Sequence, residues 1–97
     1  MIVGFADAET EDIFHDVRSK TARRRLPLVL WTAAQRKLDR LKRAVDVKDL
    51  RDPPGNRLEA LKRDLAGSFS LRINEQHRIV FELSAGEARR GGITDYH

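Results

Sequence analysis

Cysteine is absent from the chain, and its absence excludes disulfides, thiolate zinc sites and thiol nucleophiles. Long apolar runs are absent as well. Residues 1–5 are too few for the apolar segment of a signal peptide, and no stretch approaches the roughly 20 apolar residues that span a bilayer. These absences predict a cytoplasmic protein that works in a reducing compartment and has no membrane partner.

The excess of positive charge is modest, but the charges are unevenly distributed along the 97 residues. Lys and Arg number 19 against 15 Asp and Glu, which gives a net charge of +4. Acidic residues gather in residues 7–16, whereas basic residues gather in residues 18–25 and 36–43. This segregation favours a polyanionic partner. A chain of this length has room for one small core, so we expect a single domain over residues 1–97.

The beginning of the chain predicts a strand and then a helix. Residues 2–5 are typical of a short strand. Asp7 is a suitable N-cap, and the acidic residues that follow it suit the positive end of a helix dipole. The predicted helix has one apolar stripe: Ile13, Phe14 and Val17. Residues 19–27 are predicted to be a loop or a frayed helix end.

The clearest helix begins at Leu28, directly after Pro27, a residue that suits the first turn. Its apolar residues recur at spacings of three and four: Trp31, Ala34, Leu38, Leu41 and Val45. Its other face is basic: Arg36, Lys37, Arg40 and Arg43. Asp39 interrupts this face and can pair with Arg43 one turn later. A solvated charged face and a direct contact with RNA or the ribosome are both compatible with this pattern.

The second half of the chain changes to the two-residue period of strands. Apolar residues alternate with polar ones at Phe69, Leu71 and Ile73. Arg72 therefore lies on the polar face. Residues 74–77 predict a turn, and the returning strand places Arg78 on the same face of a hairpin as Arg72. A last strand is predicted at residues 87–95, weakened by two adjacent glycines.

The end of the chain offers groups that could cleave RNA without a metal. Such cleavage needs a base for the ribose 2′-hydroxyl, cations for the phosphorane and an acid for the departing 5′ oxygen. The candidate catalytic residues are Lys62, Arg72, Arg78, Asp95, Tyr96 and His97. His97 titrates nearest neutral pH, so it is the first candidate for acid or base. Taken singly, each candidate has an ordinary structural explanation, and the residues alone leave the question open.

Other kinds of site find little support in the sequence. The three histidines show no metal-ligand spacing, and no glycine-rich phosphate loop occurs. We therefore expect neither a metal nor a cofactor.

A series of short motifs runs from residue 53 to the C-terminus. In order they are Pro53-Pro54-Gly55-Asn56-Arg57-Leu58, Leu61-Lys62, Asp64, Ala66-Gly67, Ser70-Leu71-Arg72-Ile73-Asn74, Arg78-Ile79-Val80-Phe81 and Asp95-Tyr96-His97. Together they resemble the HigB toxins, a branch of the RelE/ParE toxin superfamily. Ile2, Phe5 and residues 38–50 also fit, so the resemblance covers nearly the whole chain.

The resemblance implies an α+β, RelE-like fold in which two N-terminal helices pack on a small, mostly antiparallel sheet. It implies the toxin of a type II toxin–antitoxin system, a ribosome-dependent endoribonuclease that cuts messenger RNA by 2′-hydroxyl attack and inhibits translation. It also implies a HigA-like helix-turn-helix antitoxin, through which alone the toxin would reach operator DNA. By position, catalysis falls on the six candidates above. Arg63 joins the basic helix in contacts with RNA and the ribosome.

Several positions depart from the family pattern, among them the last strand, which carries Arg89-Arg90-Gly91-Gly92 where apolar alternation is usual. Glu59 stands where a histidine is frequent, Arg63 where a glycine follows the lysine, and His77 where an aromatic residue precedes the strand arginine. Glu59 could act as a base or could pair with Arg63. The departures keep a non-catalytic module that binds ribosomal RNA or an antitoxin as an alternative. A gyrase poison of the ParE kind is a further alternative, against which the terminal Tyr96-His97 argues.

Overall fold

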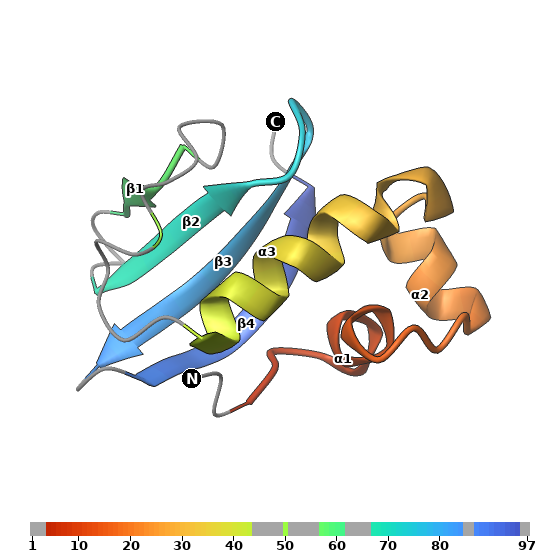
Figure 1. Ribbon diagram of the computed structural model, residues 1–97, viewed down its shortest axis with the longest axis horizontal. Helices are drawn as coiled ribbons and strands as arrows, with labels where there is room; N and C mark the ends of the chain where they lie inside the picture. The colour runs from red at the N-terminus through yellow and green to blue at the C-terminus, as the bar shows by residue number, and fades with distance from the viewer. Residues whose placement is uncertain (1–3, 44–49, 51–56, 62–66, 85–86, 96–97) are drawn as a thin grey trace.

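The computed structural model describes residues 4–43, 50, 57–61, 67–84 and 87–95. Within them, the helical elements come first: α1 (Ala8–Phe14), α2 (Lys20–Arg25), the 3₁₀ turn η1 (Leu28–Leu30) and α3 (Trp31–Arg43). The strands follow and form one antiparallel sheet in the order β1-β2-β3-β4: β1 (Glu59–Ala60), β2 (Ser68–Arg72), β3 (His77–Ser84) and β4 (Glu87–Asp95). Figure 1 shows α3 across one face of the sheet, with α1 and α2 beside it. The predicted α+β fold is confirmed.

Side-chain caps determine where the first two helices begin. Asp7 accepts a hydrogen bond of 2.8 Å from an N–H of the first turn of α1, so the predicted N-cap is confirmed. This helix ends at Phe14, and Val17, which we placed on its apolar stripe, lies beyond it and is 50% exposed. Ser19 caps α2 in the same way at 3.2 Å. Most of residues 19–27 is therefore a separate helix, which corrects the predicted loop.

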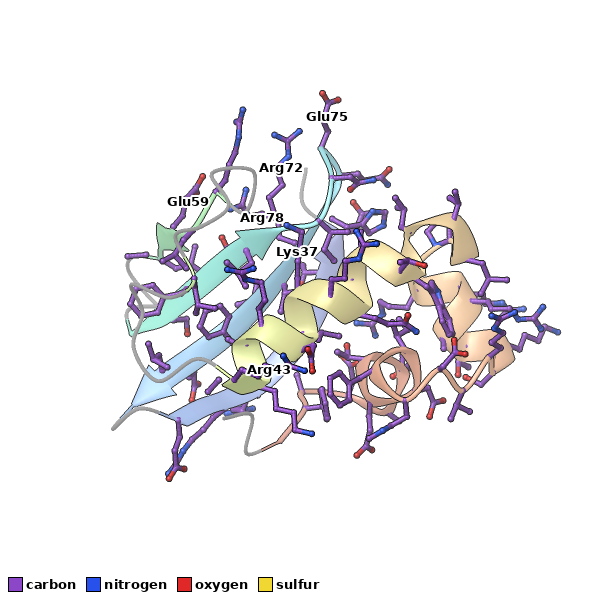
Figure 2. The ribbon with its side chains drawn as sticks, in the orientation of Figure 1. Lys37, Arg43, Glu59, Arg72, Glu75 and Arg78 are labelled. Carbon is purple, nitrogen blue, oxygen red and sulfur yellow. The ribbon has the colours of Figure 1, made fainter. Side chains whose placement is uncertain are left out.

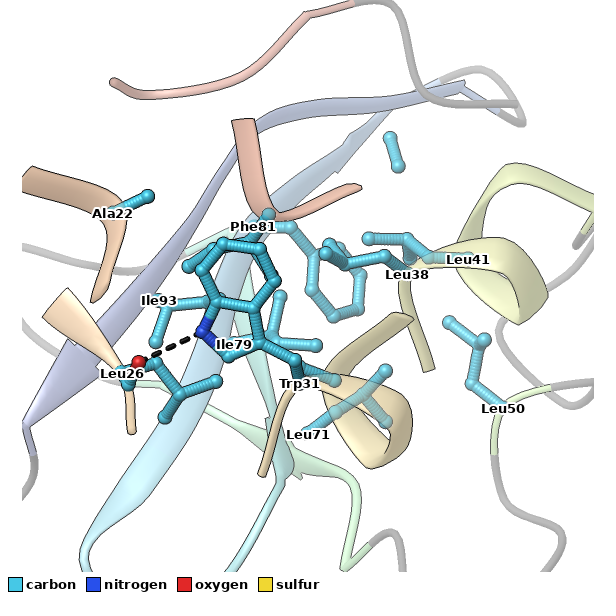
Figure 3. Close-up of a cluster of buried hydrophobic side chains, with 13 residues drawn as sticks. Ala22, Leu26, Trp31, Leu38, Leu41, Leu50, Leu71, Ile79, Phe81 and Ile93 are labelled. Carbon is cyan, nitrogen blue, oxygen red and sulfur yellow. Dashed lines mark hydrogen bonds between the residues drawn. The ribbon is translucent and has the colours of Figure 1, made fainter. Parts of the chain in front are cut away.

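α3 supplies one side of the hydrophobic core. Helical structure starts at Leu28 as predicted, but its first turn is the 3₁₀ turn η1. The buried residues of α3 are predicted ones: Trp31, Ala34, Leu38 and Leu41. The sheet packs against them with Leu71, Ile79, Phe81 and Ile93 (Figure 3). Trp31 Nε1 donates to the carbonyl of Leu26 at 2.8 Å, which satisfies the indole N–H inside the core. Val45 lies outside the described residues.

The β2–β3 hairpin divides its residues between two faces as the sequence predicts. Its opposed pairs include Phe69 with Phe81, Leu71 with Ile79, and Arg72 with Arg78. Because successive side chains of a strand alternate between faces, the apolar pairs face α3 and the arginine pair lies on the other face. The predicted placement of Arg72 and Arg78 on one face is confirmed.

β4 spans the residues predicted for the last strand, and the N-terminal segment pairs with its outer edge. Phe5 forms a parallel bridge with Gly91, and Ala6 N donates to the Gly91 carbonyl at 2.9 Å. A Cβ atom at Gly92 would lie 2.9 Å from Ala6 Cβ, so glycine permits this close approach. Residues 2 and 3 of the predicted first strand lie outside the described residues.

Two helix side chains also bind the end of β4. Thr10 Oγ1 accepts a hydrogen bond from Ile93 N at 3.0 Å, and Arg25 Nη1 donates to the Ile93 carbonyl at 2.9 Å. The same Arg25 nitrogen lies 3.0 Å from Asp7 Oδ2. The end of β4 is thereby fixed relative to α1 and α2. No helix in the described ranges is long and apolar enough to cross a membrane.

Candidate active site

A basic cleft lies at the end of the β2–β3 hairpin, where β2 ends and β3 begins. Its volume is about 330 Å³, and its lining residues are Arg57, Arg72, Asn74, Glu75 and Arg78. Arg72 and Arg78 meet there because they oppose each other in the register of the hairpin. Figure 2 shows both arginines and Glu75 at this end of the sheet, with Lys37 on the neighbouring part of α3. The cleft is therefore strongly cationic and suited to an anionic ligand.

Arg78 is the buried member of the arginine pair, with 8% of the residue exposed. Its Nε donates to Ser70 Oγ at 2.9 Å, and its Nη2 donates to the carbonyl of Arg57 at 2.6 Å. Glu59 Oε1 lies 3.7 Å from the same Nη2. These contacts fix the orientation of the guanidinium, which makes it a positioned positive charge.

Arg72 and Lys37 are cations with more exposure. The Arg72 side chain is 24% exposed, and its Nη2 lies 3.9 Å from an oxygen of Glu75, a side chain that is 95% exposed. Burial lowers the pKa of the Lys37 amino group from its ordinary value of 10.5, and repulsion from Arg40 and Arg72 lowers it further. Lys37 thus places a positive charge of α3 near Arg72, which lines the cleft.

The turn between β2 and β3 is organised by Asn74. Its Oδ1 accepts hydrogen bonds from the backbone N–H groups of Gln76 at 3.0 Å and His77 at 2.7 Å. His77 is buried, and Gln76 Nε2 donates to Asp95 Oδ2 at 3.0 Å. Asp95 opposes His77 in register, so the two side chains share one face of the sheet. Because side chains alternate along a strand, Arg78 lies on the opposite face. The contact with Gln76 joins the end of β4 to the turn, and the catalytic role of Asp95 stays a prediction.

A row of exposed arginines continues along α3. Arg36, Arg40 and Arg43 follow at spacings of four and three, which keeps them on one side of the helix. The predicted pair of Asp39 with Arg43 is present at 3.2 Å, between exposed groups. The role of this side of α3 in contacts with RNA or the ribosome stays a prediction.

Four residues of the predicted site lie outside the described residues: Lys62, Arg63, Tyr96 and His97. Glu59 is described, and it contacts Arg78 from the exposed strand β1. Within the part of the chain that the structure describes, no group of three or more His, Asp or Glu side chains could hold a metal ion.

Arg57 lines the cleft and was missed by sequence reasoning. Its φ of 44° lies in the left-handed region, and its carbonyl accepts the hydrogen bond from Arg78. The sequence offered no sign that Arg57 lies beside the arginines of the hairpin.

The fold of this chain is found in solved toxin structures. The YoeB–YefM complex from Staphylococcus aureus gives a TM-score of 0.58 at 18% identity, with 100% of this chain and 98% of that chain covered. The YoeB dimer from the same organism gives 0.57 at 22% identity, with 99% and 94% covered. Together with the helix-covered antiparallel sheet, this likeness shows that the chain has the fold of the YoeB toxins.

The sequence comparisons identify the family. Residues 3–97 match the family described as "RelE-like toxin of type II toxin-antitoxin system HigB". Toxin HigB-1 of Vibrio cholerae serotype O1 is 38% identical over 88 residues, which cover 91% of this chain and 90% of that protein. An uncharacterized protein of Haemophilus influenzae is 33% identical over 63 residues, which cover 65% and 62%. This chain therefore belongs to the HigB-like toxins of type II toxin–antitoxin systems.

Proposed function

We propose that this toxin is a ribosome-dependent endoribonuclease that cuts messenger RNA without a metal and so inhibits translation. The observation that carries the proposal is the pairing of Arg72 with Arg78 across the hairpin, in a cleft that lies near the positive charge of Lys37. Cleavage of a phosphodiester concentrates negative charge on the non-bridging oxygens of the phosphorus. Guanidinium groups stay charged and match these oxygens with two parallel donors, so such a pair suits the reaction.

In the proposed reaction the ribose 2′ oxygen attacks the adjacent phosphorus while a base removes its proton. The bond to the 5′ oxygen breaks, and an acid protonates that oxygen, which leaves a 2′,3′-cyclic phosphate and a 5′-hydroxyl. We assign the proton transfers to His97, with Tyr96 orienting the phosphate and Lys62 adding positive charge. Glu59 is a second candidate base, and its contact of 3.7 Å with Arg78 supports a position beside the cleft.

The same proposal includes the partners of the toxin. The exposed arginines of α3 are suited to phosphates of ribosomal RNA, a contact that would place the cleft against messenger RNA in the cytoplasm. One of the solved structures with a similar fold is a YoeB–YefM toxin–antitoxin complex. By analogy, a HigA-like helix-turn-helix antitoxin would bind this chain and supply its link to operator DNA.

Expression in a bacterium, with primer extension on host transcripts, tests the nuclease function. The wild-type chain is expected to arrest growth and to create new 5′ ends within translated messages. His97→Ala and Arg72→Ala are expected to abolish both effects. Arg89→Ala is the matched control, because Arg89 is exposed near the other end of β4 and pairs only with Glu87, at 3.6 Å, among the described residues.

Two results would contradict the proposal. One is unchanged growth with the wild-type chain, and the other is growth arrest by His97→Ala that equals the wild type. A gyrase cleavage assay run in parallel separates a messenger RNA nuclease from a gyrase poison.

A further inference from the structure

Arg57 differs from the other arginines of the cleft in its surroundings. The residue is exposed, and it lines the cleft together with Arg72 and Arg78. Of the carboxylates that the structure describes near the cleft, Glu59 pairs with Arg78 and Glu75 with Arg72. Among the residues that the structure describes, no carboxylate forms an ion pair with the Arg57 guanidinium. Within this described part of the cleft, the Arg57 charge is not neutralised by a carboxylate.

The backbone of Arg57 is held in a conformation that does not favour an arginine. A φ of 44° is disfavoured for any residue with a Cβ atom, and glycine adopts it readily. The hydrogen bond of 2.6 Å from the buried Arg78 to the Arg57 carbonyl holds the backbone in this state. That bond uses only the backbone of Arg57, so glycine would serve the fold at least as well. The side chain therefore needs an explanation outside the fold, as strained residues at functional sites do.

We propose that Arg57 is a third phosphate-binding residue of the cleft, positioned through its own carbonyl by Arg78. The inference rests on the proposed function and adds to it a contact with a second backbone phosphate of the RNA. Arg72 and Arg78 approach the cleft from the hairpin, whereas Arg57 approaches from the segment before β1. Cations from two sides can bind two successive phosphates of one strand. Arg78 then has two tasks, because it binds the substrate and holds the neighbouring arginine.

Arg57→Gly tests the proposal, because it removes the guanidinium and keeps the carbonyl that Arg78 binds. The probe is a short fluorescein-labelled single-stranded RNA, with affinity measured by fluorescence anisotropy over a series of salt concentrations. Loss of one phosphate contact should reduce the steepness of the log–log salt dependence by about 0.7. The affinity should fall about tenfold at low salt, as for the loss of a charge-assisted hydrogen bond.

Two further variants separate a binding role from a structural one. Arg57→Lys keeps the charge, so it should retain most of the salt dependence and lose part of the affinity. Arg89→Ala should match the wild type in RNA affinity and in its salt dependence. The thermal midpoint of Arg57→Gly should equal or exceed that of the wild type, because glycine relieves the left-handed backbone. A side chain that merely supported the fold would give the opposite change. If Arg57→Gly does not fold, Arg57→Asn replaces it, since asparagine tolerates this conformation.

The outcomes distinguish this inference from the nuclease function on which it rests. An RNA affinity and salt dependence that are unchanged in Arg57→Gly, or a wild-type chain that does not bind the RNA, would overturn the role of Arg57. Normal cutting of transcripts by that variant in cells would also contradict it and leave the nuclease function standing. RNA binding that depends on Arg57, without any cut transcripts, would support the phosphate contact and contradict the nuclease function.

Discussion

The two faces of the β2–β3 hairpin are built from alternate residues of the same strands, yet they are held together differently. On the face toward α3, Leu71 and Ile79 are fully buried in apolar contacts. On the other face, Arg78 is nearly as buried, but it is held by directed hydrogen bonds to Ser70 and to the carbonyl of Arg57. Burial alone therefore does not separate core from site. Substitutions on the first face should change stability, whereas those on the second should change stability and activity to different degrees.

The largest expected effect lies on the apolar face. Phe81→Ala removes a ring that is 1% exposed, which should lower the free energy of unfolding by about 3–5 kcal/mol. Domains of this size are stable by only about 5–15 kcal/mol, so urea unfolding followed by circular dichroism should show a large shift. Phe69→Ala is the matched control, since Phe69 stacks on Phe81 at 6.0 Å but is only partly buried. Equal losses for the two variants would contradict this account of the core.

Substitution of either arginine of the pair should abolish activity, but the two substitutions should differ in how much stability they remove. Arg78→Ala leaves Ser70 Oγ and the Arg57 carbonyl without their donor, which should cost about 2–3 kcal/mol and abolish RNA cleavage. Arg72→Ala should abolish cleavage at a cost below about 1 kcal/mol, because its described ion pair is long and its partner is exposed. Urea unfolding and primer extension on the same variants measure both quantities. The comparison fails if the two variants lose the same stability.

Substitution of the two adjacent glycines of β4 by alanine should change the stability in opposite directions. Gly92→Ala should lower the free energy of unfolding by about 1–3 kcal/mol, because the new Cβ would lie 2.9 Å from Ala6 Cβ. Gly91→Ala meets only Leu41 Cδ2, at the ordinary contact distance of 3.9 Å. It should be neutral or stabilising by up to about 1 kcal/mol. Thermal unfolding of both variants checks the sign, and a destabilised Gly91→Ala beside an unchanged Gly92→Ala would refute the packing described at this edge.

The smallest expected effect concerns Lys37. Its pKa is lowered in the folded state by burial and by Arg40 and Arg72, so the protonated amine destabilises the fold below that pKa. Lys37→Met should therefore be slightly more stable than the wild type near neutral pH. The difference should shrink as the pH rises toward the unfolded value of 10.5, where the wild type also loses the charge. Urea unfolding at several pH values tests the trend, with the exposed Lys20→Met as control, and a gap that widens with pH would show the sign to be wrong.

Periodicity predicted the parts of the fold that depend on one element or on two neighbouring strands. The buried side of α3 and the shared face of Arg72 and Arg78 follow from spacings of three to four and of two. α2 escaped prediction because its sequence is mostly charged and only Ala22 is buried. Its helix depends on the Ser19 cap and on bonds from Arg25 to Asp7 and Ile93, which are distant in sequence.

The candidate site was also predictable only in part, because some of its contacts join residues that are distant in sequence. The hairpin arginines could be paired from their alternation, because a tight turn leaves little freedom in register. Arg57 accepts a hydrogen bond from Arg78, 21 residues away in sequence, and its backbone is left-handed. Neither feature can be predicted from composition or from the spacing of residues. Asp95 was assigned by position in a motif, but its contact with Gln76 depends on the pairing of β3 with β4.

The bonds that the N-terminal segment, Thr10 and Arg25 make with residues 91–93 have a consequence for solubility at high concentration. They occupy backbone groups that an outermost strand would otherwise present to another sheet. Exposed strand edges template intermolecular pairing, and natural proteins cover or shorten them to avoid it. At the opposite side of the sheet, the strand β1 has only two residues. Both borders of the described sheet are thus poor templates for edge-to-edge aggregation.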